Sequence, residues 1–160
     1  MNSYHIIDSN VIAIANGLQT DASLQCQQNT IYFLQHIQEI VDRNECILIY
    51  DDRYIILNEC QKHCTITNKN KVGSAFLKWV FRNKNFTEKF IFHNLPTDID
   101  DNNDLLPPCF ARFDVNDRKY LFLALYYKEF RPTLNYGIDR GYPRYNQCFI
   151  DEGIVLSSLC

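Results

Sequence analysis

The sequence predicts an α/β fold in which helices cover both faces of a mainly parallel central sheet, a three-layer α/β/α sandwich. Short apolar runs of strand length alternate along the chain with longer segments of helical periodicity. Adjacent parallel strands need long crossover connections, which are usually helices lying on the faces of the sheet. With 160 residues, 46% of them hydrophobic, and no internal repeat or linker, we expect one domain over residues 1–160.

Each expected element has its own local signal. The strands are short apolar runs, and the first of them ends at an acid followed by a polar turn; the helices carry apolar residues at three- and four-residue steps. Thr20 or Asp21 is expected to cap the long second helix, and Asp51 with Asp52 the third. The strands are expected at about residues 4–8, 46–50, 90–92, 133–138 and 153–156. The helices are expected at about residues 11–15, 20–43, 53–63, 71–83 and 113–130.

Charge and cysteine content limit the class of protein. A net charge of −3 gives no overall attraction to nucleic acid, and no apolar stretch is long enough for a membrane span. The N-terminus lacks a secretion signal, so we expect a cytoplasmic protein with no membrane partner. The seven cysteines are then expected to be reduced and mostly buried. Cys60, His63 and Cys64 share a helix face, but without a fourth zinc ligand they indicate core thiols beside a polar histidine.

Residues 62–89 are locally basic although the chain is acidic. On the helix expected at 71–83, Lys71, Ser74, Lys78 and Arg82 form one polar stripe opposite an apolar face. Two interpretations stay open: a solvated surface, or a patch that contacts phosphates. The segment holds a single acid, Glu88, and the following basic residues: Lys62, Lys69, Lys71, Lys78, Arg82, Lys84 and Lys89.

Four acids stand at positions that a parallel sheet can bring together. Asp8 and Asp139 end strand-like runs, Glu59 shares the face of apolar helix residues, and Asp117 begins a helix. Capping of helices explains Asp117, or its neighbour Asp114, equally well when each is taken alone. Crowded carboxylates repel one another unless a divalent ion neutralises them, and oxygen ligands suit Mg²⁺ or Mn²⁺. Such an ion activates water and stabilises charge on a phosphodiester.

The chain resembles the PIN-domain nuclease family. The stretches that carry the resemblance are Ile6–Val11, Leu57–Glu59, Asp117–Leu125, Gly137–Asp139 and Gly153–Leu156. The resemblance implies an α/β/α sandwich and a metal-dependent endoribonuclease that cleaves single-stranded RNA, a toxin or defence effector among its possible roles. It also implies that Asp8, Glu59, Asp117 and Asp139 hold the ion. Family members often carry a further acid where this chain has Gly141, which favours one ion over two.

The resulting hypothesis assigns a role to each residue. Asp8, Asp117 and Asp139 hold one Mg²⁺ or Mn²⁺, with Glu59 as an outer or base-like member. Ser9 and Asn10 orient Asp8, and Asp114 is an accessory acid. The residues expected to hold the nucleic-acid backbone are Lys71, Lys78, Arg82, Arg140 and Arg144.

Other functions stay open at this point. A PIN-like nuclease acting on DNA and an inactive scaffold that binds RNA or protein fit the same pattern, and a protein partner or an oligomer is compatible with each. A haloacid-dehalogenase-type phosphatase also begins with a strand that ends in an aspartate. It would need a second aspartate where Asn10 stands, so the sequence disfavours it.

Overall fold

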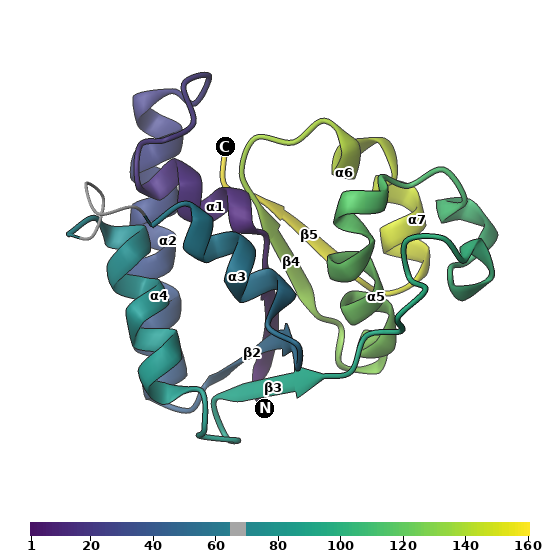
Figure 1. Ribbon diagram of the computed structural model, residues 1–160, viewed down its shortest axis with the longest axis horizontal. Helices are drawn as coiled ribbons and strands as arrows, with labels where there is room; N and C mark the ends of the chain where they lie inside the picture. The colour runs from purple at the N-terminus through teal and green to yellow at the C-terminus, as the bar shows by residue number, and fades with distance from the viewer. Residues whose placement is uncertain (65–69) are drawn as a thin grey trace.

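The computed structural model describes residues 1–64 and 70–160 and confirms the predicted α/β fold (Figure 1). Five strands form one sheet in the order β3-β2-β1-β4-β5, and every neighbouring pair is parallel. Of the predicted basic segment, Lys69 lies outside the described residues. The strands are β1 (Ser3–Ile7), β2 (Cys46–Asp51), β3 (Phe90–His93), β4 (Thr133–Tyr136) and β5 (Val155–Ser158).

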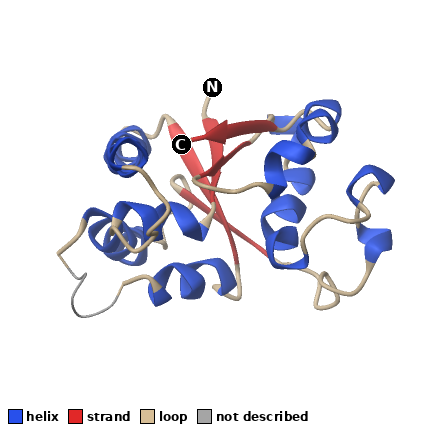
Figure 2. Ribbon diagram, turned by 90° about the horizontal axis from the view of Figure 1, so that it is seen from above, coloured by secondary structure: helices blue, strands red, loops and turns tan. Residues whose placement is uncertain are grey.

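The helices lie on the two faces of the sheet (Figure 2). From β1 to β2 to β3 the chain moves across the sheet in one direction, and from β3 to β4 to β5 it moves in the other. Because parallel crossovers are right-handed, these two directions place the connecting helices on opposite faces. The first group is α1 (Ser9–Ala15), α2 (Leu24–Asp42), α3 (Ile55–Lys62) and α4 (Val72–Asn83). The second group is α5 (Arg118–Tyr126), α6 (Gly141–Arg144) and α7 (Asn146–Asp151).

Two predicted helices have different bounds in the structure, and two further helices were not predicted. α2 begins at Leu24 because Ser23, rather than Thr20 or Asp21, accepts the Cys26 N–H as its N-cap. α5 spans only Arg118–Tyr126, with short 3₁₀ turns before and after it. The helices α6 and α7 were not predicted, since neither has the two or three turns that make a helical period visible.

The packing of α4 corrects the predicted polar stripe. Ser74 is buried, with its Oγ accepting from Asn16 Nδ2 at 3.0 Å, whereas Ala75, expected on the apolar face, is exposed. Lys71, Lys78 and Arg82 are exposed, so the basic stripe holds these three residues without Ser74. α4 packs against α1, α2 and α3, on the face of the sheet away from α5.

Disulfides correct the prediction of seven reduced thiols. Cys26 is bonded to Cys160 and Cys109 to Cys148, across 134 and 39 residues of sequence. The free thiols of the described residues are Cys46, Cys60 and Cys64, the first two of them buried. Disulfides persist mainly in oxidising compartments, so the two pairs do not support the expected cytoplasmic location. None of the described helices has the length and apolar character needed to cross a bilayer.

Candidate metal centre

The strand order creates a crevice at the carboxyl ends of β1 and β4. After β1 the chain enters α1 on one face of the sheet, and after β4 it enters α6 on the other. Side chains at such a switch point are not covered by a crossover, which is why open parallel sheets bind ligands there. Asp8 follows β1 directly, and Asp139 follows β4 after a short turn.

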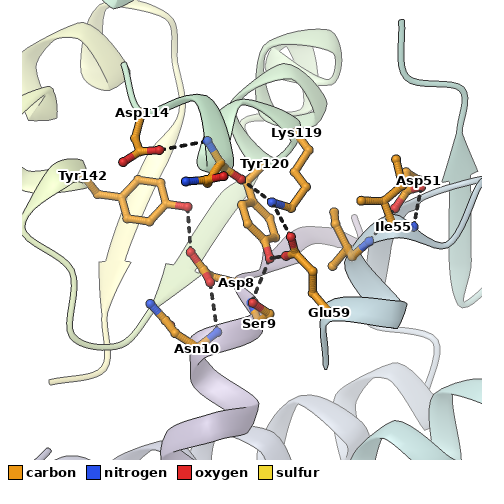
Figure 3. A network of polar contacts seen from close by, with 12 residues as sticks. Asp8, Ser9, Asn10, Asp51, Ile55, Glu59, Asp114, Lys119, Tyr120 and Tyr142 are labelled. Carbon is orange, nitrogen blue, oxygen red and sulfur yellow. Dashed lines mark hydrogen bonds and ion pairs between the residues drawn. The ribbon is translucent and has the colours of Figure 1, made fainter. Parts of the chain in front are cut away.

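Asp8 is buried in this crevice, with 4% of its surface exposed. Its Oδ1 accepts the Asn10 N–H at 3.0 Å, so it caps α1. Its Oδ2 accepts the Tyr142 hydroxyl at 2.8 Å, and Tyr142 itself is fully buried (Figure 3). Each carboxylate oxygen therefore has one fixed donor and a further lone pair free for a ligand.

Asp117 and Asp139 reach the same place from two other elements. Asp117 stands at the start of α5, which packs across β1, β2 and β4. Asp139 Oδ1 accepts the backbone N–H groups of Gly141 and Tyr142, which fixes its side chain. A Cβ at Gly141 would lie 2.9 Å from Asp139 Oδ1, so a larger residue there would displace that carboxylate. The lack of a further acid at position 141 thus has a local steric reason.

Carboxylate oxygens of Asp8, Asp117 and Asp139 lie within 4.8 Å of one another. Burial raises the pKa of Asp8 to about 6, and the negative charge of Asp139 adds to this. Burial also raises the pKa of Asp117 to about 7, with Asp8, Asp139 and Asp114 contributing repulsion. Three carboxylates whose negative charges repel one another form a set of oxygen ligands that fits a hard divalent cation such as Mg²⁺ or Mn²⁺.

Glu59 lies outside this cluster, beside it. Its Oε1 forms an ion pair with Lys119 Nζ at 2.9 Å, and its Oε2 accepts the Tyr120 hydroxyl at 3.0 Å (Figure 3). The same hydroxyl accepts the Ser9 N–H at 3.0 Å, and burial raises the pKa of Tyr120 well above 10, so it stays protonated. These partners explain why an acid shares the helix face of apolar residues. They also keep Glu59 beside the cluster of three aspartates rather than within it.

The residues expected to orient Asp8 act mainly through their backbone. Asn10 donates its N–H to Asp8, while its side-chain oxygen accepts the Gly137 N–H at 3.0 Å and ties α1 to the end of β4. A Cβ at Gly137 would overlap Ile14 Cδ1, so this close approach requires glycine. Ser9 contributes its N–H to Tyr120. Asp114 accepts the Asn116 N–H at 2.8 Å and caps the turn that leads to Asp117.

An arginine-rich pocket of about 300 Å³ opens beside the cluster. Its walls carry Asp117 and Asp139 together with the two arginines that the sequence analysis placed near the site, Arg140 and Arg144. Within the described residues, none of the pocket's arginines has a carboxylate within 4.0 Å. The cations are therefore available to an anionic ligand. The pocket is lined by Arg112, Asp114, Asp117, Asp139, Arg140, Gly141, Arg144 and Tyr145.

The basic residues of α4 are not part of this pocket. Lys78 lines a different, largely apolar pocket with Leu77 and Phe81, and neither Lys71 nor Arg82 lines the arginine-rich pocket. Because α4 packs on the opposite face of the sheet from α5, the structure separates the predicted stripe from the aspartates.

Sequence reasoning missed four residues of the site. Tyr142 and Tyr120 supply hydroxyls to Asp8 and Glu59, Lys119 pairs with Glu59, and Arg112 lines the arginine-rich pocket. The lone signal for Lys119 was a charged residue at the start of a largely apolar helix. The tyrosines gave none, because a buried tyrosine is ordinary core material until its hydroxyl partner is known.

The fold and the site define the chain as a parallel α/β protein with a cluster of three aspartates compatible with a metal ion. Comparison with protein-family models, with curated proteins and with solved structures finds no significant match. What the site does must therefore follow from its own residues.

Proposed function

We propose that this chain is a Mg²⁺- or Mn²⁺-dependent nuclease that hydrolyses single-stranded RNA. The cluster of Asp8, Asp117 and Asp139 at the switch point of the sheet carries the proposal. A divalent ion held there would supply stabilisation of charge on phosphoryl oxygens and a lower pKa for water. The choice of RNA rests on the resemblance of the chain to PIN-domain nucleases.

The surrounding residues suit a phosphodiester substrate. Arg112, Arg140 and Arg144 form no ion pair with any residue that the structure describes, and they line one pocket with Asp117 and Asp139. A guanidinium binds phosphate oxygens in a two-pronged geometry. The arginines would hold the anionic backbone while the aspartates face the phosphorus that is attacked. This alternation of cations and acids favours phosphoryl chemistry over a site for a free cation alone.

Direct attack by water fits the lining of this pocket. Among the described residues, no serine, threonine, cysteine or histidine lines the arginine-rich pocket, and two of its carboxylates are the groups that would hold the ion. The chain's own residues contribute by holding the aspartates in a fixed orientation. Tyr142 and the Asn10 N–H fix the orientation of Asp8, and the backbone N–H groups of Gly141 and Tyr142 fix Asp139.

Cleavage of labelled oligonucleotides tests the proposal. Purified protein is incubated with single-stranded RNA and DNA 20-mers in Mg²⁺, Mn²⁺ or chelator. We expect RNA cleavage that requires the ion and is lost in Asp117→Asn, which keeps the side-chain shape and removes one charge. Asp21→Asn is the matched control, because Asp21 is an exposed acid outside the cluster.

Two results would contradict the proposal. Equal cleavage by the wild type and Asp117→Asn would show that the aspartate cluster takes no part in the reaction. Absence of cleavage, together with no metal-induced rise in the melting temperature, would show that the cluster does not bind the ion. Faster cleavage of DNA than of RNA would change the proposed substrate to DNA and leave the proposed metal site unchanged. A restraining protein partner and an oligomer stay predictions.

A further inference from the structure

A second, smaller pocket of about 200 Å³ is lined by both members of the Glu59–Lys119 ion pair. Asn116, which lines it, immediately precedes Asp117, and Glu59 connects it through Tyr120 to Ser9. One segment, residues 114–119, therefore lines both pockets, with Asp114 and Asp117 at the arginine-rich pocket and Val115, Asn116 and Lys119 at this one. A chain bound in the first pocket can continue into the second.

The walls of this small pocket combine apolar side chains with polar and charged ones. Ile55 at the start of α3 and Leu95 and Ile99 after β3 line it, the last two being almost fully buried. Val115 also lines it and keeps 45% of its surface exposed. The aliphatic side chains of the wall can pack against the face of a flat ring, and the polar ones can bind its edge. The volume is of the order of a single base and not of a base pair.

One carboxylate in this pocket lacks a partner. Within the described residues, the side chain of Asp100 forms no hydrogen bond and no ion pair, although its backbone is firmly held. Arg118, only 5% exposed, donates to the Asp100 carbonyl at 3.0 Å and to Asn103 Oδ1 at 2.6 Å. The buried arginine thus fixes the backbone of the loop from which the exposed Asp100 side chain projects.

We propose that this pocket binds an unpaired base of the substrate beside the phosphate that is cleaved, and that Asp100 selects guanine. A carboxylate only accepts hydrogen bonds. The Watson–Crick edge of guanine offers two adjacent donors, N1–H and the N2 amino group, which one carboxylate accepts together; uracil offers a single donor between two carbonyls. Single-stranded nucleic acid is recognised through such edges and through stacking. The inference rests on the proposed function, since it deepens the substrate of the same site.

Binding without catalysis tests the base preference. Fluorescence anisotropy is measured in chelator with labelled U₁₀ and with decamers that carry one central G, A or C, as RNA and as DNA. We expect the G-containing RNA to bind about tenfold more tightly than U₁₀. Asp100→Asn should reduce that ratio to about twofold or less. Asp101→Asn, the same charge change at an exposed neighbour outside the pocket, should leave it unchanged.

Steric closure of the pocket provides an independent test. Val115→Trp fills the mouth at a position that already tolerates exposure, so the fold should persist, and the preference for G should disappear. Val155→Trp, at a comparably exposed valine on β5, is the control. Equal binding of all decamers by the wild type, or a preference unchanged in both pocket variants, would overturn the base pocket and leave the nuclease proposal intact. Guanine-selective binding by a protein that never cleaves would instead overturn the nuclease proposal alone.

Discussion

Two strands of this sheet end in a buried aspartate, and the two aspartates have different fates. Asp51 ends β2 and is 0% exposed; its two oxygens accept the N–H groups of Ile55 and Ile56 at 2.8 and 2.9 Å (Figure 3). Asp8 follows β1 and accepts one backbone N–H and the Tyr142 hydroxyl, beside two further acids. The same local pattern produces a helix cap in one place and a candidate ligand in the other.

The neighbouring strands decide between these outcomes. The connections that leave β1 and β2 both run on one face of the sheet, so the N-terminus of α3 covers Asp51 and satisfies its charge with the helix dipole. The connections that leave β1 and β4 run to opposite faces, which leaves Asp8 beside Asp139 and open to a ligand. A buried acid next to a helix N-terminus stabilises the fold, whereas a buried acid next to other acids costs stability until an ion binds.

The largest expected effect compares the two aspartates directly. Asp8→Asn should lower RNA cleavage at least about a hundredfold, because it removes a charge that holds the ion, while the protein stays folded. Asp51→Ala should retain most activity but lower the free energy of unfolding by about 2 kcal/mol, because two helix N–H groups lose their acceptor. Cleavage assays and urea denaturation measure both variants. Full activity in Asp8→Asn would break the comparison.

The pH dependence of stability sharpens the comparison in the metal-free protein. The pKa of Asp8 rises from 3.8 to about 6 on folding, so the folded state holds its proton more tightly than the unfolded chain. The stability that this proton contributes is complete below pH 3.8 and is lost as the pH rises through about 6. We therefore expect Asp8→Asn to become more stable than the wild type by about 2–3 kcal/mol between pH 4 and pH 7.

Urea denaturation in chelator at several pH values measures this difference. Addition of Mg²⁺ should restore the stability of the wild type above pH 6 and leave the stability of Asp8→Asn unchanged. Only the wild type keeps the full set of carboxylates that bind the ion. Parallel stability curves for the two proteins across this pH range would contradict the assigned burial cost.

A smaller effect is expected from the tyrosine that orients Asp8. Tyr142→Phe removes the donor to Asp8 Oδ2 while keeping the ring packed, so cleavage should fall about tenfold and more metal should be needed. The pKa of Asp8 should rise further, because that hydrogen bond favours the charged carboxylate. Titration of cleavage against Mg²⁺ measures the change. Tyr50→Phe is the control, since this buried tyrosine lies on β2 beside Asp51.

The smallest effect is expected on α4. Lys78→Ala with Arg82→Ala should change cleavage by no more than about twofold, because exposed charges on the far face of the sheet are screened from the site. Arg140→Ala with Arg144→Ala removes the same amount of charge from the arginine-rich pocket. This double variant should lose clearly more cleavage than the α4 double variant, because it binds RNA more weakly. Comparable losses in the two double variants would show that the substrate also reaches α4.

The residues themselves determined the alternation of strands and helices, the parallel sheet and the acids that end its strands. These features are local, since an apolar period and a capping residue are visible within a few positions of Ile6, Leu34 or Asp51. Only the tertiary structure decided which strand-end acid lies among other acids, which hydroxyls meet them, and which cysteines pair. Asp8 and Tyr142 are 134 residues apart, as are Cys26 and Cys160. Contacts of that kind depend on the strand order and on which face each helix covers, and no local pattern encodes either.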